Sequence, residues 1–460
     1  MKVLLLNPPG RTTYIRDYFC SKTTKSNYLY QPIDLVMLSG VAAEEHEVAV
    51  LDAIAERLDP ADAGARIDAL APDVVVSLVG AVSWDEDRAF LASVARERRV
   101  LVIGDVLQER SAERLRAEPW IEAALHAFTS DDLCRYLRGE RDALEDMTVR
   151  DAAGEPRRVQ TQEARRRKGP YHVPRPRHEL FPERGYRFSF ARSERFATVL
   201  TDYGCPYPCT FCVIGTLGYR TRPVAEVLDE IDELRARGIH ELFVLDQTFG
   251  LQRERARELC DALASRGDLS WTTFARPDTA DDERLAWMKR AGCHTVILGA
   301  ESPDDDLLEA YEKGYASEAV RAAFRRAKGH GLRTVGTFLV GMPEQDEDAL
   351  ERTLAFACEL ELDFLSLNVA VPRFGTPFRE KALAMGLCQE DDVVMDQGGA
   401  DAFLPTQTLD RATLVRLKRR MIRRFYLRPS YLWRRLRAIG SWYELRAQAR
   451  EGMALLLRNV

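Results

Sequence analysis

The chain has 460 residues, a formal net charge of −6 at pH 7 and 46% hydrophobic residues, which is typical of a soluble globular protein. Its length exceeds one typical domain and predicts about two or three. No run of about eighteen apolar residues occurs, so we expect no membrane-spanning helix. Nine scattered cysteines argue against a disulfide framework and favour a reducing, cytoplasmic compartment.

Residues 1–140 alternate short apolar runs with helical patterns. We predict strands at 2–6, 48–51, 73–78 and 100–103, and helices at 32–43, 60–70 and 84–96. This alternation predicts an α/β domain with a doubly wound parallel sheet. The opening residues therefore form a first strand rather than a signal peptide. Ligands bind such sheets beyond the carboxyl ends of the strands, here in the loops 7–10, 77–83, 104–105 and 126–129.

The segment 11–30 is long for a connection between a strand and a helix, and it is rich in Arg, Lys and Tyr. Long loops in compact domains are often functional. We expect it to lie over the ligand edge of the sheet, where it either contacts substrate or cofactor phosphate or is a solvated excursion.

The periodicity fades after residue 140, and charge runs and prolines predict a linker over 141–195. Strands and helices alternate again over 196–385, with strands predicted at 197–201, 241–245, 270–274, 294–299, 334–340 and 364–369. These six units fall short of the roughly eight that close a barrel. We expect a third, helical and basic region over 386–460.

The loop Gly204-Cys205-Pro206-Tyr207-Pro208-Cys209-Thr210-Phe211-Cys212 carries three closely spaced cysteines. Thiolates are soft ligands of the kind that hold iron–sulfur clusters, and three of them leave one iron of a cubane cluster open. A structural zinc site normally needs four protein ligands, and no fourth Cys or His stands at a usable spacing. A zinc site and three unrelated cysteines remain the alternatives.

The pattern Cys205-x-x-x-Cys209-x-Phe211-Cys212 resembles the signature loop of the radical S-adenosylmethionine (SAM) superfamily. That resemblance implies a [4Fe-4S] cluster on Cys205, Cys209 and Cys212, with SAM on the open iron and Phe211 near its adenine. One electron from the cluster would cleave SAM to a 5′-deoxyadenosyl radical. It also implies that residues 196–385 form an open (βα)6 partial barrel.

Residues after the predicted barrel strands are the further candidates for SAM binding, because function in such barrels lies at the carboxyl ends of strands. Arg276 could pair with the methionine carboxylate, and Glu301 and Ser302 could hold the ribose hydroxyls or the methionine ammonium. Gly341 would let the backbone approach the adenine. Asp246 follows the second strand. A structural salt bridge at the barrel rim is the alternative for Arg276 and Asp246.

The N-terminal domain resembles the cobalamin-binding domain that precedes many radical SAM domains, on the opening Asn7-Pro8-Pro9, the helix after Pro32 and the run 71–77. This resemblance implies a cobalamin site at Asn7, Pro8, Ser77, Gly104 and Thr129. The Asp-x-His-x-x-Gly motif that supplies a lower-face histidine ligand is absent, and Gly104-Asp105 stands where the family usually has two glycines. A domain that binds no cofactor and acts as a lid is the alternative.

Residues 411–460 carry a net charge of about +12, which leaves about −18 for the rest of the chain. Over 414–437, helical spacing would put apolar residues on one face and arginines on the other. A packed C-terminal cap, a helix in a membrane interface and a contact with nucleic acid phosphates are the three interpretations. Nucleic acid is the weakest, since no appended RNA-binding domain is recognisable.

The resemblance implies a cobalamin-type radical SAM enzyme, acting by methyl transfer on an unactivated carbon of a small or lipid-like metabolite. A non-methylating reaction, such as oxidative cyclisation, ring rearrangement or carbon–carbon coupling, is the alternative. A binding protein with a purely structural cluster fits less well, because one coordination position stays open. Arg373 and Thr376, after the sixth strand, are candidates for substrate contact or for a structural turn. An external one-electron reductant of flavodoxin or ferredoxin type, low oxygen and peripheral membrane contact complete the expectations.

Overall fold

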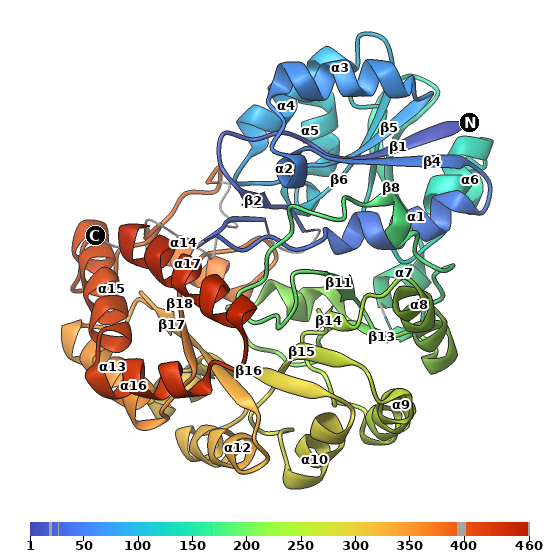
Figure 1. Ribbon diagram of the computed structural model, residues 1–460. Coiled ribbons are helices and arrows are strands. Elements are labelled where there is room, and N and C mark those ends of the chain that lie inside the picture. Colours follow the sequence, from blue (N-terminus) through green and yellow to red (C-terminus); the bar gives the residue numbers. More distant parts are fainter. Residues whose placement is uncertain (18–20, 26, 167, 393–401, 459–460) are drawn as a thin grey trace.

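The computed structural model describes residues 1–17, 21–25, 27–166, 168–392 and 402–458. Two sheets lie one above the other in Figure 1, and the C-terminal helices pack against the lower one. Within the described ranges, none of the helices combines the length and the hydropathy that a bilayer crossing requires.

The N-terminal sheet has seven strands in the order β4-β1-β5-β6-β7-β8-β9. The first five are parallel, and β8 and β9 add an antiparallel edge. The predicted doubly wound domain is confirmed, and its sheet continues into the range predicted as linker. The strands are β1 (Lys2–Asn7), β4 (Glu47–Asp52), β5 (Val74–Leu78), β6 (Arg99–Ile103), β7 (Ala123–Leu125), β8 (Asp146–Arg150) and β9 (Pro156–Gln160).

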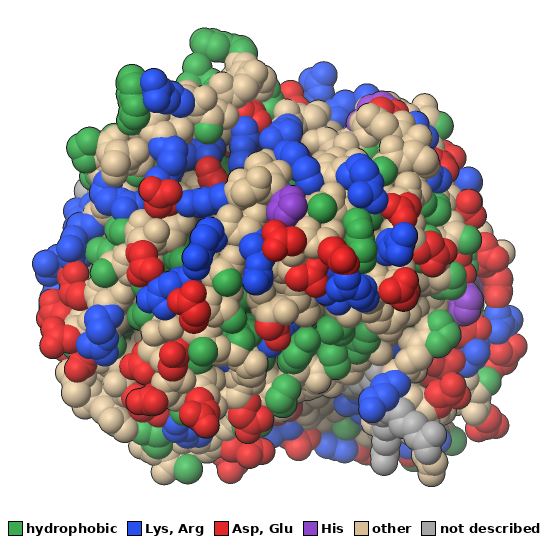
Figure 2. All heavy atoms as spheres, turned by 90° about the horizontal axis from the view of Figure 1, so that it is seen from below, with side chains coloured by type: hydrophobic (Ala, Val, Ile, Leu, Met, Phe, Trp, Pro, Cys, Tyr) green, Lys and Arg blue, Asp and Glu red, His purple; other side chains and the backbone are tan. Residues whose placement is uncertain are grey.

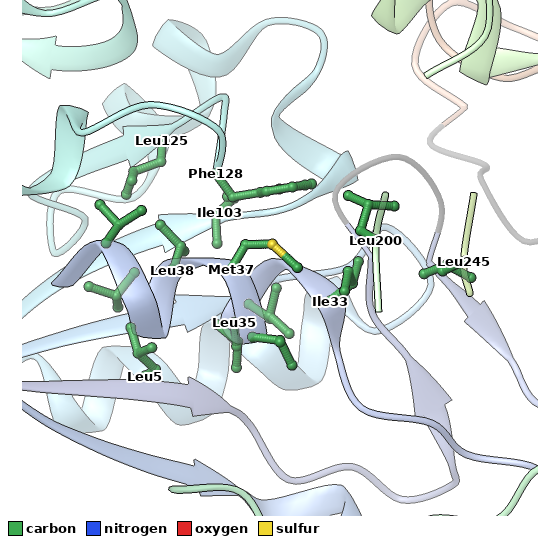
Figure 3. Close-up of a cluster of buried hydrophobic side chains, with 14 of the residues drawn as sticks. Leu5, Ile33, Leu35, Met37, Leu38, Ile103, Leu125, Phe128, Leu200 and Leu245 are labelled. Carbon is green, nitrogen blue, oxygen red and sulfur yellow. The ribbon is translucent and has the colours of Figure 1, made fainter. Parts of the chain in front are cut away.

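Helix α1 (Ile33–Ala43) joins the two halves of the molecule. It is buried on nearly every side, because one face meets the first sheet through Leu5 and Ile103 while the other meets the barrel through Leu200 and Leu245, all in one hydrophobic cluster (Figure 3). This shared core fixes the two sheets relative to each other. The other helices of this half are α2 (Ala53–Glu56), α3 (Pro60–Leu70), α4 (Trp84–Val94), α5 (Ser111–Ala117) and α6 (Asp132–Arg138).

The second sheet has six parallel strands in the order β11-β14-β15-β16-β17-β18. Because β11 and β18 stand at opposite edges, the barrel is open, as the resemblance implies. The strands are β11 (Phe196–Val199), β14 (Glu241–Val244), β15 (Ser270–Ala275), β16 (Cys293–Glu301), β17 (Arg333–Val340) and β18 (Phe364–Val369). The outer helices are α8 (Val224–Ala236), α9 (Arg253–Arg266), α10 (Asp282–Arg290), α11 (Asp305–Ala310), α12 (Ser317–Gly329) and α13 (Glu347–Glu359).

Short elements connect the two halves. A two-stranded hairpin lies within the segment 11–30, and a three-stranded sheet in the order β10-β13-β12 lies beside the cysteine loop. They are β2 (Tyr14–Ile15), β3 (Lys22–Thr23), β10 (Lys168–Pro170), β12 (Asp202–Gly204), β13 (Tyr219–Thr221), α7 (Gln162–Arg166) and the 3-10 turns η1 (Asp105–Leu107), η2 (Arg141–Ala143), η3 (His178–Leu180) and η4 (Val213–Leu217).

The C-terminal region is helical, as predicted, with α14 (Pro377–Ala384), α15 (Arg411–Tyr426), α16 (Pro429–Ala438) and α17 (Trp442–Arg458). The apolar face of α15 packs into the barrel core through Leu417, Met421 and Phe425. On its other face, Arg424 pairs with Glu351 of α13. Helix α15 is therefore a packed cap on the last units of the barrel.

Candidate active site

The cysteine loop is held at both ends by backbone hydrogen bonds. Strand β12, which leads into it, pairs with β13, which follows it, and the Cys205 N–H donates to the Gly218 carbonyl at 2.7 Å. Within the loop, the Cys212 N–H donates to the Cys209 carbonyl at 3.0 Å. The loop is therefore a fixed excursion of a short hairpin at the carboxyl end of β11.

The three thiols of this loop border one cavity. They do not all lie within 4.8 Å of one another, whereas zinc–sulfur bonds of about 2.3 Å would bring the sulfurs of a zinc site closer together than that. Burial raises the pKa of Cys205 to about 11, so a bound cation is needed to hold this residue as a thiolate at neutral pH. The spacing and chemistry of the set fit a cluster better than a single zinc ion.

The cavity lies between the two halves of the molecule and has a volume of about 990 Å³. One end is formed by the cysteine loop and by residues near the carboxyl ends of the barrel strands. Aromatic and aliphatic side chains form part of its walls. The polar and charged residues at this end are Gln247, Arg276, Glu301, Lys313, Tyr315 and Arg373.

Glu301 and Lys313 form an ion pair on the cavity wall. The Lys313 ammonium donates to Glu301 Oε1 at 2.8 Å and lies 5.4 Å from the centroid of the Phe211 ring. Burial disfavours the charged form of Lys313, but the Glu301 charge outweighs it and holds the lysine pKa well above its usual range. Glu301 has a φ of +56°, a backbone strain that is typical of functional positions.

Arg276 lines the cavity, but its guanidinium is already engaged. It donates to both carboxylate oxygens of Asp278 at 2.9 Å and to the Lys313 carbonyl at 2.8 Å. Its Nη1 lies 3.8 Å from Cys209 Sγ, and its Cζ lies 3.5 Å from the Tyr207 ring centroid. In this arrangement Arg276 supports the cysteine loop, and its predicted pairing with the methionine carboxylate stays a prediction.

Three other predicted SAM residues do not line the cavity. Asp246 accepts hydrogen bonds from the backbone N–H groups of Thr201 and Asp202, at 2.7 and 3.1 Å, so it fixes the chain that leads into the cysteine loop. Ser302 Oγ accepts from the Asp304 N–H at 3.1 Å. Gly341 has a φ of +81°, and a Cβ there would lie 2.5 Å from Leu414 of α15, so its small size serves helix packing.

The remaining barrel candidates divide between the cavity and its support. Phe211 and Arg373 line the cavity, and Arg373 is 97% buried, with 3% exposure. Thr376 is the N-cap of α14: its side chain accepts from the Arg379 N–H at 3.3 Å and donates to the Arg373 carbonyl at 2.6 Å. Thr376 therefore acts as the structural turn residue of the two alternatives.

The residues predicted for cobalamin form the closed edge of the N-terminal sheet instead of a cavity wall. Asn7 donates to Asp52 Oδ1 at 2.9 Å and accepts from Arg16 Nη1 at 2.8 Å, while the Pro8 carbonyl accepts from the same nitrogen at 2.9 Å. Arg16 also forms a fully buried ion pair with Asp87, at 2.7 Å. Arg16 thus occupies part of the crevice at the carboxyl edge of this sheet.

The other three cobalamin candidates are equally engaged. Ser77 Oγ donates to the Leu78 carbonyl at 3.0 Å, and Thr129 Oγ1 accepts from Arg220 at 2.9 Å. At Gly104 a Cβ would lie 1.7 Å from the Val79 carbonyl oxygen, so the glycine allows a close approach of two strands of this chain. None of the five residues borders the cavity between the two halves, and their role toward cobalamin stays a prediction.

The N-terminal residues that do reach the cavity come from the segment 11–30. Lys25 spans the two halves, because its ammonium donates to Ser366 Oγ and the Leu367 carbonyl of β18, both at 3.1 Å. The length and composition of this segment predict a functional loop but do not single out residues within it. Those that border the cavity are Thr12, Asp17, Lys22, Thr23, Thr24, Lys25, Tyr28 and Tyr30.

Sequence reasoning also missed Lys313 and Tyr315, which follow α11 and not a strand. Tyr315 donates to the Gly299 carbonyl of β16, and the Arg276 Cζ lies 5.0 Å from its ring centroid. The only signal was the short polar run around Gly314 between two helical patterns. A rule that examines strand ends alone does not find residues on the return loops.

A sequence model of the family described as the radical SAM superfamily matches residues 199–357. The chain is also 30% identical, over 455 residues, to a protein of Pyrococcus horikoshii named uncharacterized methyltransferase PH0819, and the alignment covers 94% of each protein. The matched range begins in β11 and includes the cysteine loop.

Two solved structures share the arrangement of both sheets. The radical SAM methyltransferase TsrM of Kitasatospora setae has a TM-score of 0.65 at 22% identity, covering 84% of this chain and 76% of that one. The cobalamin-dependent radical SAM enzyme OxsB has a TM-score of 0.72 at 16% identity, covering 100% of this chain and 71% of that one. These likenesses support the two-sheet fold with its helical C-terminal region. With its fold, its three-thiol loop and its full-length relative taken together, the chain belongs to the radical SAM superfamily.

Proposed function

We propose that this radical SAM enzyme transfers a methyl group to an unactivated carbon of its substrate. The observation that carries the proposal is the set of three thiols, Cys205, Cys209 and Cys212, on the wall of a large cavity that also holds the Glu301–Lys313 pair. When bound, the [4Fe-4S] cluster and SAM supply a 5′-deoxyadenosyl radical that removes a hydrogen atom from the substrate.

We assign the SAM end of the cavity to four side chains. Lys313 would bind the methionine carboxylate, because it is a buried cation beside the cysteine loop. The Glu301 carboxylate would pair with Lys313 and would also accept hydrogen bonds from the methionine ammonium or the ribose hydroxyls. Phe211 would pack on the adenine. Arg276 would hold the cysteine loop through Cys209 and exclude water from one side of the cluster.

Cobalamin is the proposed methyl carrier, and it would supply the methyl group to the substrate carbon. Support comes from the printed names of relatives: the Pyrococcus protein and TsrM are called methyltransferases, and OxsB is called cobalamin-dependent. Lys22, Thr23, Thr24 and Lys25 border the cavity and carry the donors that would suit the amide side chains and phosphate of cobalamin. Arg16 and Ser21 fill the crevice beyond them. The nucleotide tail of cobalamin would therefore bind outside the predicted crevice at the edge of the N-terminal sheet.

Product analysis tests this function. Anaerobically reconstituted protein given SAM and a reductant should produce 5′-deoxyadenosine, and S-adenosylhomocysteine in addition if methyl transfer occurs. 5′-Deoxyadenosine without S-adenosylhomocysteine, under cobalamin-replete conditions, would favour the non-methylating alternative. Formation of neither product would refute both.

We also propose that the C-terminal helices contact an anionic lipid surface from the cytoplasmic side. Exposed Leu432, Trp433, Leu436 and Trp442 stand in a region that carries about fourteen Arg and Lys, a combination that suits a membrane interface. Hydrophobic side chains project beside Lys and Arg side chains at the upper left of Figure 2. Flotation with phosphatidylglycerol vesicles tests this contact, and unchanged partitioning after replacing Trp433 and Trp442 with Ser would contradict it.

A further inference from the structure

The cavity does not end at the SAM site but continues to the opposite end of the barrel. It is lined by Phe364 at the start of β18 and also by Asn368 near its end. Strands rise about 3.3 Å per residue, so these two positions lie roughly 13 Å apart along the strand. Because β18 is an edge strand, its open side faces the cavity, and the C-terminal helices close that side.

A buried arginine stands at the far end of this cavity. Arg435 of α16 is 5% exposed and lines the cavity. Its Nη1 donates to Asp363 Oδ1 at 2.8 Å, and its Cζ lies 4.5 Å from the Phe364 ring centroid. Its Nε and Nη2 are buried and have no hydrogen-bond partner among the described residues.

These two nitrogens form one edge of the guanidinium fork. Two parallel N–H groups on that edge match the two oxygens of a carboxylate or a phosphate, and a buried donor without a partner costs about 1–3 kcal/mol. Lys418 and Arg419 of α15 also line the cavity and add positive charge to it. The arrangement is that of an oxyanion site that the described residues leave unfilled.

The wall between this arginine and the cysteine loop is apolar. Aromatic rings stack along it, with Phe188 and Phe243 4.1 Å apart and Phe190 and Phe364 4.9 Å apart between ring centroids. Leu432, Leu436 and Ile439 of the C-terminal helices border the same space and complete an apolar mouth. The apolar part of a substrate would be removed from water along these rings, which favours binding.

We propose, resting on the function proposed above, that the substrate is a long-chain amphipathic oxyanion. Its carboxylate or phosphate binds the Nε–Nη2 edge of Arg435, and its apolar chain lies along the aromatic wall toward the cluster. The carbon that reacts is then remote from the acidic group, separated from it by roughly the length of strand β18. The mouth between α16 and α17 is the entry, on the side of the molecule that carries the exposed Leu and Trp residues.

Binding of three probes to the reconstituted, full-length protein tests this inference. Oleate, oleyl phosphate and oleyl alcohol share one apolar chain and differ only in the head group. We expect oleate or oleyl phosphate to bind at least about tenfold more tightly than oleyl alcohol, and the tighter of the two identifies the head group. Equal binding of all three would overturn the proposal.

Variants of two arginines on α16 locate the site. Arg435→Gln should weaken binding of the preferred anion about tenfold and leave oleyl alcohol unchanged. Arg435→Lys keeps the positive charge beside Asp363 but loses the two parallel N–H groups, so it should show most of the same loss of affinity. This variant also controls for a folding defect of Arg435→Gln. Arg437→Gln is the matched control, because Arg437 packs on Trp433 and does not line the cavity. Unchanged anion affinity in both Arg435 variants would contradict the assignment.

The same samples separate this inference from the proposed function. SAM cleavage to 5′-deoxyadenosine in the absence of any lipid tests the cluster alone. If cleavage fails while anion-selective binding persists, the proposed function falls and the oxyanion site stands. If cleavage occurs and the probes bind without head-group selectivity, only the substrate assignment falls.

Discussion

The two parallel sheets present carboxyl edges of the same kind, yet one edge is closed and the other is open. At the N-terminal sheet, Arg16 and Ser21 occupy the edge and satisfy the carboxylates of Asp87 and Asp105. At the barrel, the cysteine loop and the Glu301–Lys313 pair face a cavity of about 990 Å³. Polar groups that are satisfied within the chain hold a fold together, and those that face a cavity are available for chemistry.

The predicted cobalamin residues and the predicted cluster residues stand in these two different surroundings. Asn7 and Ser77 stand at strand ends, as the fold rule requires, but their hydrogen bonds are used within the chain. Cys205, Cys209 and Cys212 instead border the cavity of the barrel. Variants at each edge test this difference between the two sheets.

The largest effect should come from the open edge. Cys209→Ala removes one of the three thiols at the cavity, and we expect reductive SAM cleavage to fall below detection because a cluster needs its thiolate ligands. Iron content and 5′-deoxyadenosine measure the outcome. Cys260→Ala is the matched control, since Cys260 is buried in α9 away from the cavity. SAM cleavage that persists in the Cys209 variant would show that the three thiols at the open edge are not needed for this chemistry.

The next effect concerns the closed edge. Arg16→Met removes one partner of a pair in which both side chains are fully buried, and breaking such a pair typically costs about 3–5 kcal/mol. The free energy of unfolding from denaturant titration measures this loss. Arg88→Met, in a solvent-exposed pair with Asp85, is the control and should change stability little. Equal losses of unfolding free energy in the two variants would show that the buried Arg16–Asp87 pair does not stabilise this edge.

The third effect depends on pH at the same closed edge. Burial raises the pKa of Asp105 to about 6, so between about pH 4 and pH 6 the folded chain holds a proton that the unfolded chain has released. Stability relative to Asp105→Asn should therefore fall by roughly 2 kcal/mol as the pH rises from 4 to 7. Unfolding free energies of both proteins across this range measure the difference. A stability difference that does not change with pH would contradict the burial of this carboxyl group.

The smallest effect returns to the open edge. Lys313→Met removes the buried cation beside Glu301, and we expect SAM to bind about tenfold more weakly, equivalent to about 1.4 kcal/mol. Equilibrium binding of SAM to the reconstituted protein is the measurement. Lys381→Met, whose lysine pairs with Glu344 outside the cavity, should bind SAM normally. Undiminished SAM affinity in the Lys313 variant would show that the methionine carboxylate binds to another residue.

Much of the fold follows from the sequence, because strong periodicity places elements reliably. The strands predicted at 241–245 and 364–369 agree closely with β14 and β18. Single residues at strand ends were harder, since successive side chains of a strand point to opposite sides: Gln247 borders the cavity, whereas Asp246 turns away from it. Lys313 and Arg435 lie far from the cysteine loop in sequence, so only the folded chain brings them to its cavity.

The most direct test of the account is the electron paramagnetic resonance spectrum of the anaerobically reconstituted and reduced protein, recorded with and without SAM. The account predicts a [4Fe-4S] spectrum that changes when SAM is added, because one iron keeps an open position. A spectrum that SAM leaves unaltered, or a protein that retains zinc and no iron, would contradict it.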